Sequence, residues 1–318
     1  GGSFAHLFGT WSLVPNETRR RLDGFVLNRF RGDPTLLAPG PEQLAGMTSM
    51  APLGVIPMIE HDLPREEGFA DGASASRRSG RPVVVAPRLP YGSNLDEFQP
   101  LSTVADLRWL VEPPDVDRLD PVRDVVLLPG SKHVLADLEW MRTLGWDHAI
   151  RRAAERDVRV VGICGGAMML GTSVDDPSGV DGGRPATADG LGLVPLSTTM
   201  ERDKTVRTVV VRSVGFGAGS GAGFGGIGVD PVAGYEIRVG RVAGSAEPWL
   251  TEAGSDEVLG WVKGNVYATT VHGLFESPSV VESLVGSRPV PVLEQTFDTL
   301  ADLVDRHVDT DRLLRMVE

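Results

Sequence analysis

The stretch 159–171, RVVGICGGAMMLG, decides the fold, and it contains the only cysteine of the chain. An apolar strand that stops at a nucleophile-type residue and continues through small residues into a helix typically raises that residue above a sheet on a tight turn. We expect Gly162, Gly165 and Gly166 to let the backbone turn sharply and to leave room for a substrate carbonyl. The stretch therefore predicts a strand–turn–helix unit with Cys164 at the turn.

Two interpretations of Cys164 follow from this position. A thiol at the N-terminus of a helix is favoured as thiolate, so Cys164 is predicted to be an exposed and activated nucleophile. The alternative is a small buried core residue, because free cysteine is among the most buried residue types. The glycines on either side, between a strand and a helix, favour the nucleophile.

Elements on both sides of this stretch alternate between strands and helices. In SKHVLADLEWMRTLG the apolar residues fall on one helical face, Ser131 can cap the start and Gly145 can end the helix. Such alternation predicts an α/β fold with a mainly parallel sheet flanked by helices. The expected elements are strands at 82–87, 124–130 and 159–163, helices at 131–145 and 147–156, and a strand running into a loop at 264–276.

Composition limits the class of protein. The 318 residues allow two domains, and the net charge of −12 with a pI near 5.0 argues against nucleic-acid or membrane-surface partners. One cysteine excludes an intrachain disulfide framework, and no apolar run approaches the ~20 residues of a membrane span. We expect a soluble, cytoplasmic protein without a secretory signal, and the Gly-Gly start indicates a cut in a longer chain.

The expected domains are 1–75 and 76–318, because REEGFADGASASRRSGRP, from Arg65 to Pro82, has almost nothing apolar to bury. The first domain has two apolar stretches, GFVLNRF at 24–30 and APLGVIPMI at 51–59, that predict buried strands. In the second, the glycine-rich residues 213–228 predict a surface insertion and 296–308 an amphipathic terminal helix.

A thiol nucleophile needs a base, and the chain offers six histidines, which differ in their expected positions. His272 follows an apolar strand and precedes a glycine, so it is predicted at a strand end, where parallel sheets place their chemistry. His133 follows the LPGS turn and is predicted to lie at the rim of the site. Backbone amides of Gly130, Ser131 and Gly165 are expected to form an oxyanion hole.

Several motifs together resemble the cobyric acid synthase family. They include VVLLPGSKHVLADLEWMRTLG, VGICGGAMMLG, GLGLVPLSTTM, GYEIRVG and VHGLFES in the family's order, and upstream GFVLNRFRGD, LGVIPM and RLPYGSNLDEFQPL. The resemblance covers essentially the whole chain. It implies a flavodoxin-like class I glutamine amidotransferase domain, preceded by a truncated, dethiobiotin-synthetase-like α/β domain of the P-loop type.

The resemblance also implies a reaction. The family uses glutamine, ATP and Mg²⁺ to amidate the b, d, e and g carboxylates of adenosylcobyrinic acid a,c-diamide, which gives cobyric acid in cobalamin biosynthesis. Carried over by motif, Cys164 is the nucleophile that forms a thioester and His272 is the active-site histidine. Glutamine and a corrinoid are the implied substrates. No cofactor is expected at the glutaminase site itself.

The chain departs from the family pattern at both sites. Many class I amidotransferases have a glutamate two positions after the histidine, where this chain has Leu274, so Glu276 is left as a candidate orienter of the ring. Arg238 replaces a common His. No Gly-Lys dipeptide occurs, so the GxxxxGK[ST] phosphate loop is absent and must come from a missing N-terminal segment or a separate chain.

Two further groups of residues keep two interpretations each. Asn28 and Arg29 match a family segment at a strand end and either contact nucleotide or serve as a loop-fixing Asn and a solvated Arg. The acidic residues Asp175, Asp176 and Asp181 could suggest a metal, but a turn-rich surface loop is the preferred interpretation, and no metal site is predicted.

The function itself also has alternatives. The same fold could serve another acceptor, as in the related cobyrinic acid a,c-diamide synthase or in amidation of cell-wall precursors. A chain with an inert Cys164 could instead be a non-catalytic corrinoid-binding or scaffolding protein.

Overall fold

The computed structural model describes residues 2–59, 80–214, 231–289 and 293–317, and its chain divides into two compact units. One unit comprises Gly1–Leu63 together with Val292–Glu318, and the other is Pro64–Pro291. This division differs from the expected domains 1–75 and 76–318, because the C-terminal segment joins the first unit. Much of the predicted linker and of the glycine-rich insertion lies outside the described residues.

The larger unit is built on a sheet whose centre is parallel. Five neighbouring strands run parallel in the order β5-β3-β6-β8-β15, which confirms the predicted α/β class. Their near-continuous apolar sequences reflect burial on both faces. The bounds are β3 Val83–Pro87, β5 Asp106–Leu110, β6 Val125–Leu128, β8 Arg159–Ile163 and β15 Val266–Thr269.

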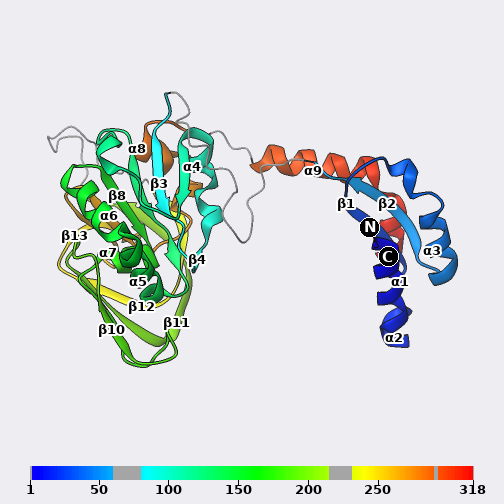
Figure 1. The fold of residues 1–318 in the computed structure, drawn as a ribbon, viewed down its shortest axis with the longest axis horizontal. Coiled ribbons are helices and arrows are strands. Elements are labelled where there is room, and N and C mark those ends of the chain that lie inside the picture. The colour runs from blue at the N-terminus through cyan, green and yellow to red at the C-terminus, as the bar shows by residue number, and fades with distance from the viewer. Residues whose placement is uncertain (1, 60–79, 215–230, 290–292, 318) are drawn as a thin grey trace. The chain divides into compact units, whose positions relative to one another are not determined.

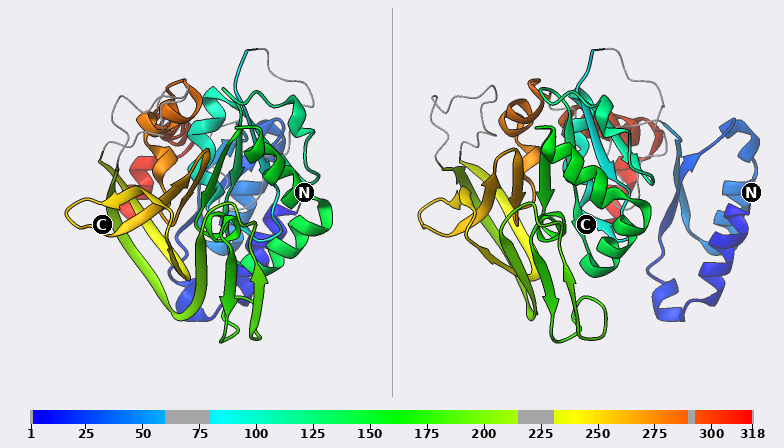
Figure 2. Two further views of the ribbon diagram at one scale, coloured as in Figure 1. Left: turned by 90° about the vertical axis from the view of Figure 1, so that its left-hand side faces the viewer. Right: turned by 60° about the vertical axis from the view of Figure 1, so that its left-hand side comes forward.

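Beyond β15 the sheet continues as a largely antiparallel extension. Strand β14 pairs with β15 and β13, and β13 pairs with β11, all antiparallel, while β9 joins β11 in parallel. The hairpin of β11 and β12 is prominent in Figures 1 and 2. The bounds are β9 Ser173–Asp176, β10 Ala186–Asp189, β11 Leu196–Ser213, β12 Val232–Gly244, β13 Glu247–Glu252 and β14 Val258–Lys263.

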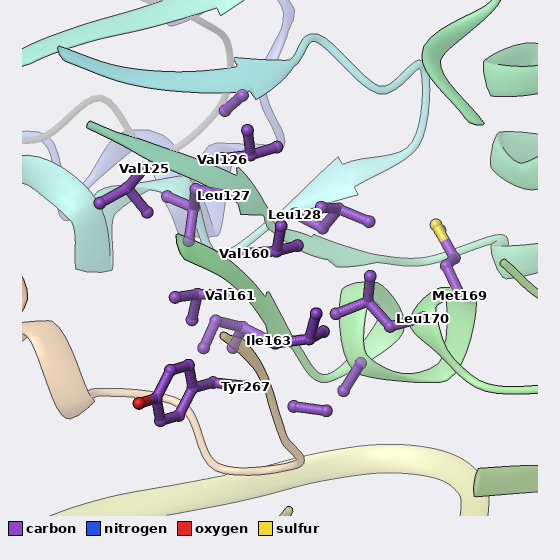
Figure 3. Close-up of a cluster of buried hydrophobic side chains, with 14 of the residues drawn as sticks. Val125, Val126, Leu127, Leu128, Val160, Val161, Ile163, Met169, Leu170 and Tyr267 are labelled. Atoms are coloured by element: carbon purple, nitrogen blue, oxygen red, sulfur yellow. The ribbon is translucent and has the colours of Figure 1, made fainter. Parts of the chain in front are cut away.

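Helices flank the sheet and bury its central strands. Figure 3 shows part of the core around β6, β8 and the following helix; Val125, Leu127, Val161 and Ile163 are 0% exposed, and Leu170 of that helix belongs to the same cluster. Aliphatic burial of this extent is the dominant favourable term in folding. The helices are η2 Leu95–Phe98, α4 Gln99–Val104, η3 Val116–Arg118, α5 Val134–Leu144, α6 Trp146–Glu155, α7 Gly165–Leu170, η4 Leu274–Glu276 and α8 Pro278–Val285.

The N-terminus of α5 differs from the expectation. Gly145 ends the helix in the left-handed region, at φ 84°, as predicted. The N-cap is His133 rather than Ser131, because the Ser131 hydroxyl bonds instead to the carboxylate of Asp137, at 2.6 Å. The carboxylate of Asp181 accepts the N–H groups of Val134 and Leu135 and completes the cap.

The smaller unit contains two parallel strands, β1 Gly24–Phe30 and β2 Ala51–Pro57, which confirms both predicted strands (Figure 1). The predicted terminal helix forms α9, and it packs on β2. A second helix, α10, follows it. The helices of this unit are α1 Ser3–Leu13, α2 Asn16–Arg19, η1 Pro34–Leu37, α3 Gly40–Thr48, α9 Leu293–His307 and α10 Thr310–Val317. None of the helices that the structure describes has both the length and the apolar character needed to cross a membrane.

Two short strands complete the larger unit at the point where its site is built. Strands β4 Gly92–Ser93 and β7 Gly130–Ser131 pair antiparallel and tie the segment after β3 to the segment after β6. Because β3 and β6 are neighbouring parallel strands, this pair lies at the carboxyl edge of the sheet.

Candidate active site

Cys164 lies at the sharp turn that the sequence predicts, directly after β8 and as the N-cap of α7. Its backbone has φ 49° and ψ −106°, a conformation that residues other than glycine rarely adopt. Its N–H donates to the carbonyl of Thr269 on neighbouring β15, at 2.7 Å. Strain of this kind persists only where the surroundings over-determine it, and it concentrates at functional sites.

The three glycines around Cys164 have a role other than the expected one. The left-handed φ falls on Cys164 itself, and the glycines instead allow segments to approach closely. A Cβ atom on Gly165 would lie 2.6 Å from the amide nitrogen of Ser131, and one on Gly162 would lie 2.8 Å from the carbonyl carbon of Gly166. Their missing side chains therefore bring α7 against β8 and against the segment after β6.

Cys164 is less exposed than the sequence predicts. Only 6% of the residue is exposed, because β12 passes over it and the carbonyl of Ile237 lies 3.8 Å from Sγ. The sulfur nevertheless lines a cavity of about 230 Å³, together with His272. Access to the thiol is thus through this cavity, which we call the Cys164 pocket.

His272 reaches the same pocket from the strand beside β8. Strands β8 and β15 pair in parallel, with Ile163 opposite Thr269, so the residues that follow each strand meet at one sheet edge. His272 is 1% exposed. Burial alone would lower its pKa, but hydrogen bonds with Cys164 and Glu97, and the charges of the same two groups, raise the pKa of His272 from 6.5 to about 10.

Glu97 is the carboxylate that holds the imidazole. Its Oε1 lies 2.8 Å from Nδ1 of His272, and its Oε2 accepts the N–H of Gly273 at 2.9 Å. Glu97 is 2% exposed and lies in η2, which packs beside η4. Bonding at Nδ1 leaves Nε2 as the ring nitrogen available to the thiol.

The candidate orienter Glu276 was therefore the wrong carboxylate. The residue that contacts Nδ1 of His272 is Glu97, which lies 175 residues earlier in the chain. Glu276 is a neighbour of this pair, since burial and the charges of Glu97 and Asp96 raise its pKa. The only sequence signal for Glu97 was its place in the motif RLPYGSNLDEFQPL, and nothing local connects that motif to the histidine.

Tyr235 on β12 holds His272 from another side. The two residues exchange backbone hydrogen bonds, N–H of Tyr235 to the carbonyl of His272 at 3.1 Å and the reverse at 2.8 Å. Their rings stack with centroids 5.3 Å apart and an interplanar angle of 18°. The hydroxyl of Tyr235 accepts a bond from Asn94 at 3.0 Å, and burial, followed by the charge of Glu97, raises its pKa to about 12.

The predicted oxyanion segment lies beside the thiol and the imidazole. A Cβ atom on Gly130 would lie 3.1 Å from Cε1 of His272, and one on Gly165 would lie 2.6 Å from the amide nitrogen of Ser131. The buried carboxyl of Asp137 fixes this segment by accepting bonds from the hydroxyl of Ser131 and the amide of Tyr91. Burial raises the pKa of Asp137, against the opposing effect of these two bonds.

Several of the remaining candidate residues have structural partners. The Oδ1 of Asn28 accepts the N–H of Arg29 at 2.8 Å, as in the loop-fixing interpretation, and contact of these two residues with nucleotide stays a prediction. Asp176 accepts the N–H groups of Val180 and Asp181 within its loop. The described residues contain no group of three or more His, Cys, Asp or Glu that could hold a metal ion.

Comparison with known proteins agrees with the motifs. The family model of the CobB/CobQ-like glutamine amidotransferase domain matches residues 83–280. The cobyric acid synthase of Variovorax paradoxus (strain S110) is 43% identical over 325 residues, covering 100% of this chain and 65% of that protein. That of Polaromonas sp. (strain JS666 / ATCC BAA-500) is 39% identical over 348 residues, covering 100% and 66%.

Solved structures are similar at lower identity. PurLQS from Thermotoga maritima covers 65% of this chain and 98% of its own, with 14% identity and a TM-score of 0.46. A glutamine amidotransferase crystal structure covers 64% and 99%, with 15% identity and a TM-score of 0.43. The chain spans 65% and 66% of the lengths of the two cobyric acid synthases, about two thirds of each.

Proposed function

The chain belongs to the CobB/CobQ-like glutamine amidotransferase family, and we propose that it releases ammonia from glutamine at Cys164. One observation carries this proposal. The sulfur of Cys164 and the ring of His272 line one cavity of about 230 Å³ at the carboxyl edge of two neighbouring parallel strands. A thiol beside an imidazole that is itself held by a carboxylate is the arrangement that activates a nucleophile.

The proposed reaction has two steps. The Cys164 thiolate attacks the side-chain carboxamide carbon of glutamine, and the imidazolium of His272 gives its proton to the departing nitrogen, which leaves as ammonia. The resulting γ-glutamyl thioester is cleaved by water, which loses a proton to His272 and releases glutamate. Backbone amides of the segment Gly130–Ser131 and of Gly165 would hold the negative charge on the carbonyl oxygen in both steps.

Two features support these roles. Glu97 holds Nδ1 of His272, so the proton to be transferred is on Nε2, the ring nitrogen that is available to the thiol. The pKa of His272, raised to about 10, keeps the ring protonated at neutral pH, as the proton donor of the first step requires.

The acceptor of the ammonia is proposed from the similarity to cobyric acid synthases. We propose the b, d, e and g carboxylates of adenosylcobyrinic acid a,c-diamide, which would place the chain in cobalamin biosynthesis. Amidation of a carboxylate requires activation, for which ATP and Mg²⁺ are expected in the complete enzyme. The chain has no Gly-Lys dipeptide and hence no GxxxxGK[ST] phosphate loop, so its residues do not fit that role.

Reaction with a glutamine-analogue electrophile tests the nucleophile. Because Cys164 is the only cysteine in the chain, alkylation by 6-diazo-5-oxo-L-norleucine can be read from the intact mass. We expect one adduct on the wild type, blocked by excess glutamine and absent from Cys164→Ala. Glutamate release should fall by at least about 10³-fold in the same variant.

Two results would contradict the proposal. One is undiminished glutamate release by Cys164→Ala, and the other is a folded wild type that resists the electrophile, as a non-catalytic corrinoid-binding protein would. The mass of the product formed from a corrinoid, with the rest of the synthase supplied, distinguishes the proposed acceptor from that of cobyrinic acid a,c-diamide synthase or a cell-wall precursor.

A further inference from the structure

The Cys164 pocket is enriched in lysine relative to the rest of the chain. The chain has 28 arginines and only three lysines, yet two of the three, Lys132 and Lys204, line this cavity. Lys132 directly follows β7, on the segment that approaches Gly165. The third lysine, Lys263, ends β14 and does not line the pocket.

Lys204 reaches the pocket through an irregularity in β11. The pairing of β11 with β12 shifts register between Met200 and Thr205, and Lys204 lies within that interruption. Register irregularities bend a strand and change the direction of its side chains, often next to active sites. Met200, on the other side of the interruption, lines the same cavity.

Arg238 also lines the pocket, but its guanidinium already has hydrogen-bond partners. Nε of Arg238 lies 2.8 Å from Oε1 of Glu236, and its Nη1 donates to the carbonyl of Gly240 at 2.7 Å. Glu236 is 0% exposed and also bonds to Nε of Arg207 and to the hydroxyl of Thr270. The positive charge of Arg238 is therefore compensated by a buried carboxylate.

Asp181, the one acidic residue among the described residues that line the pocket, also has hydrogen-bond partners. Oδ2 of Asp181 lies 2.8 Å from Nδ1 of His133, and the carboxylate accepts the N–H groups of Val134 and Leu135. Within the described parts of the chain, no carboxylate forms an ion pair with Lys132 or Lys204. Among the described residues that line this cavity, the charge left without an opposite partner is therefore positive, in a chain of net charge −12.

We propose that Lys132 and Lys204 bind the α-carboxylate of glutamine while its carboxamide lies at Cys164. This inference rests on the proposed function, because it assigns the other end of the same substrate. Ammonium groups form charge-assisted hydrogen bonds with a carboxylate, and two of them from different segments fix its position. Such a pair would select substrates in which the carboxamide and a carboxylate are separated as they are in glutamine.

Binding to the inactive Cys164→Ala protein tests the inference separately from catalysis. Titration calorimetry would compare glutamine with two analogues: 5-amino-5-oxopentanoate keeps the carboxylate and lacks the amine, and 4-aminobutanamide keeps the amine and lacks the carboxylate. In this background we expect Lys132→Met and Lys204→Met each to raise the Kd of both carboxylate ligands about tenfold. The weak binding of 4-aminobutanamide should not change.

Matched variants exclude general effects of charge. Lys263→Met removes the same charge outside the pocket and should leave every Kd unchanged, whereas Lys204→Arg should restore most of the affinity for glutamine. With Cys164 present, the two pocket variants should raise KM for glutamine and leave kcat nearly unchanged.

The possible failures are distinguishable. Glutamine binding that is unaffected by both pocket variants, or that is equally weakened by Lys263→Met, would overturn the inference even if the wild type hydrolyses glutamine. Lysine-dependent binding in a protein without turnover or electrophile labelling would support the carboxylate site and reject the proposed function. A protein that binds none of the three ligands at millimolar concentration would overturn the inference.

Discussion

At the scale of single residues, Glu97 acts on the proposed chemistry through the imidazole of His272. It is a buried carboxylate whose two oxygens bond to Nδ1 of His272 and to the N–H of Gly273. It therefore sets both the orientation of the imidazole and the nitrogen that carries the reactive proton. In a Ser-His-Asp triad, changing the corresponding carboxylate to an amide lowers kcat about 10⁴-fold because the ring adopts the wrong tautomer.

We predict that Glu97→Gln lowers kcat for glutamine hydrolysis by about 10²- to 10⁴-fold. The charge of Glu97 is among the causes that raise the pKa of His272 to about 10, so the variant should lower that pKa. The alkaline limb of the residual kcat profile should accordingly shift to lower pH. Glutamate release measured between pH 6 and 11 checks both effects.

Glu276→Gln is the matched control, since it neutralises a neighbouring carboxylate that makes no contact with Nδ1. Its kcat should stay within a few-fold of the wild type. Equal losses in the two variants would indicate a general electrostatic effect instead of positioning by Glu97.

At the scale of elements, β12 covers the site and supports it. The strand belongs to the antiparallel extension of the sheet, and its bonds with His272 form an isolated bridge across the loop that follows β15. The same strand supplies Ile237 over the sulfur and Arg238 at the pocket wall. One strand thus limits access to the thiol and restrains the imidazole.

We predict that Tyr235→Ala lowers kcat/KM about 2- to 12-fold, because a ring pair contributes roughly 0.5–1.5 kcal/mol. Tyr235→Phe keeps the stacked ring and loses only the bond with Asn94, so it should remain close to the wild type. Both variants keep the backbone bridge. A loss as large in the Phe variant as in the Ala variant would show that the hydroxyl, and not the ring, positions His272.

At the scale of the whole molecule, the two ends of the chain belong to one unit. The backbone of Gly54 on β2 bridges Val308, and the N–H of Asp309 donates to the carbonyl of Leu53 at 2.7 Å. Ala51, Leu53 and Val308 form a small core with Val304 and Met316. The C-terminal helices therefore complete the smaller unit, while the Cys164 pocket is built from the larger one alone.

We predict that Gly54→Ala destabilises the smaller unit by about 1–3 kcal/mol, because its Cβ would overlap the backbone of His307 and Val308. Gly46→Ala, in α3, meets open space and should stabilise the same unit by about 0.5–1 kcal/mol. The free energy of unfolding of each unit, measured by hydrogen exchange in increasing urea, checks this. The larger unit and its labelling at Cys164 should be unaffected by either change.

The sequence by itself determined the features that depend on local patterns. Strands β1 and β8 form with their predicted bounds, and Cys164 lies on the predicted strand–turn–helix bend, because apolar runs and glycines act on their immediate neighbours. The placement of His272 at the end of a strand beside Cys164 also followed, since parallel strands bring their carboxyl ends to one edge.

Only the tertiary structure decided which distant residues meet at that edge. Glu97 lies far from His272 in sequence, and Tyr235 and Lys204 reach the site from an antiparallel extension that no local pattern predicted. Such contacts depend on strand order, register and the course of loops, which are set by long-range pairing. The same reason explains why a C-terminal helix that was recognisable from its periodicity packs against β2, near the start of the chain.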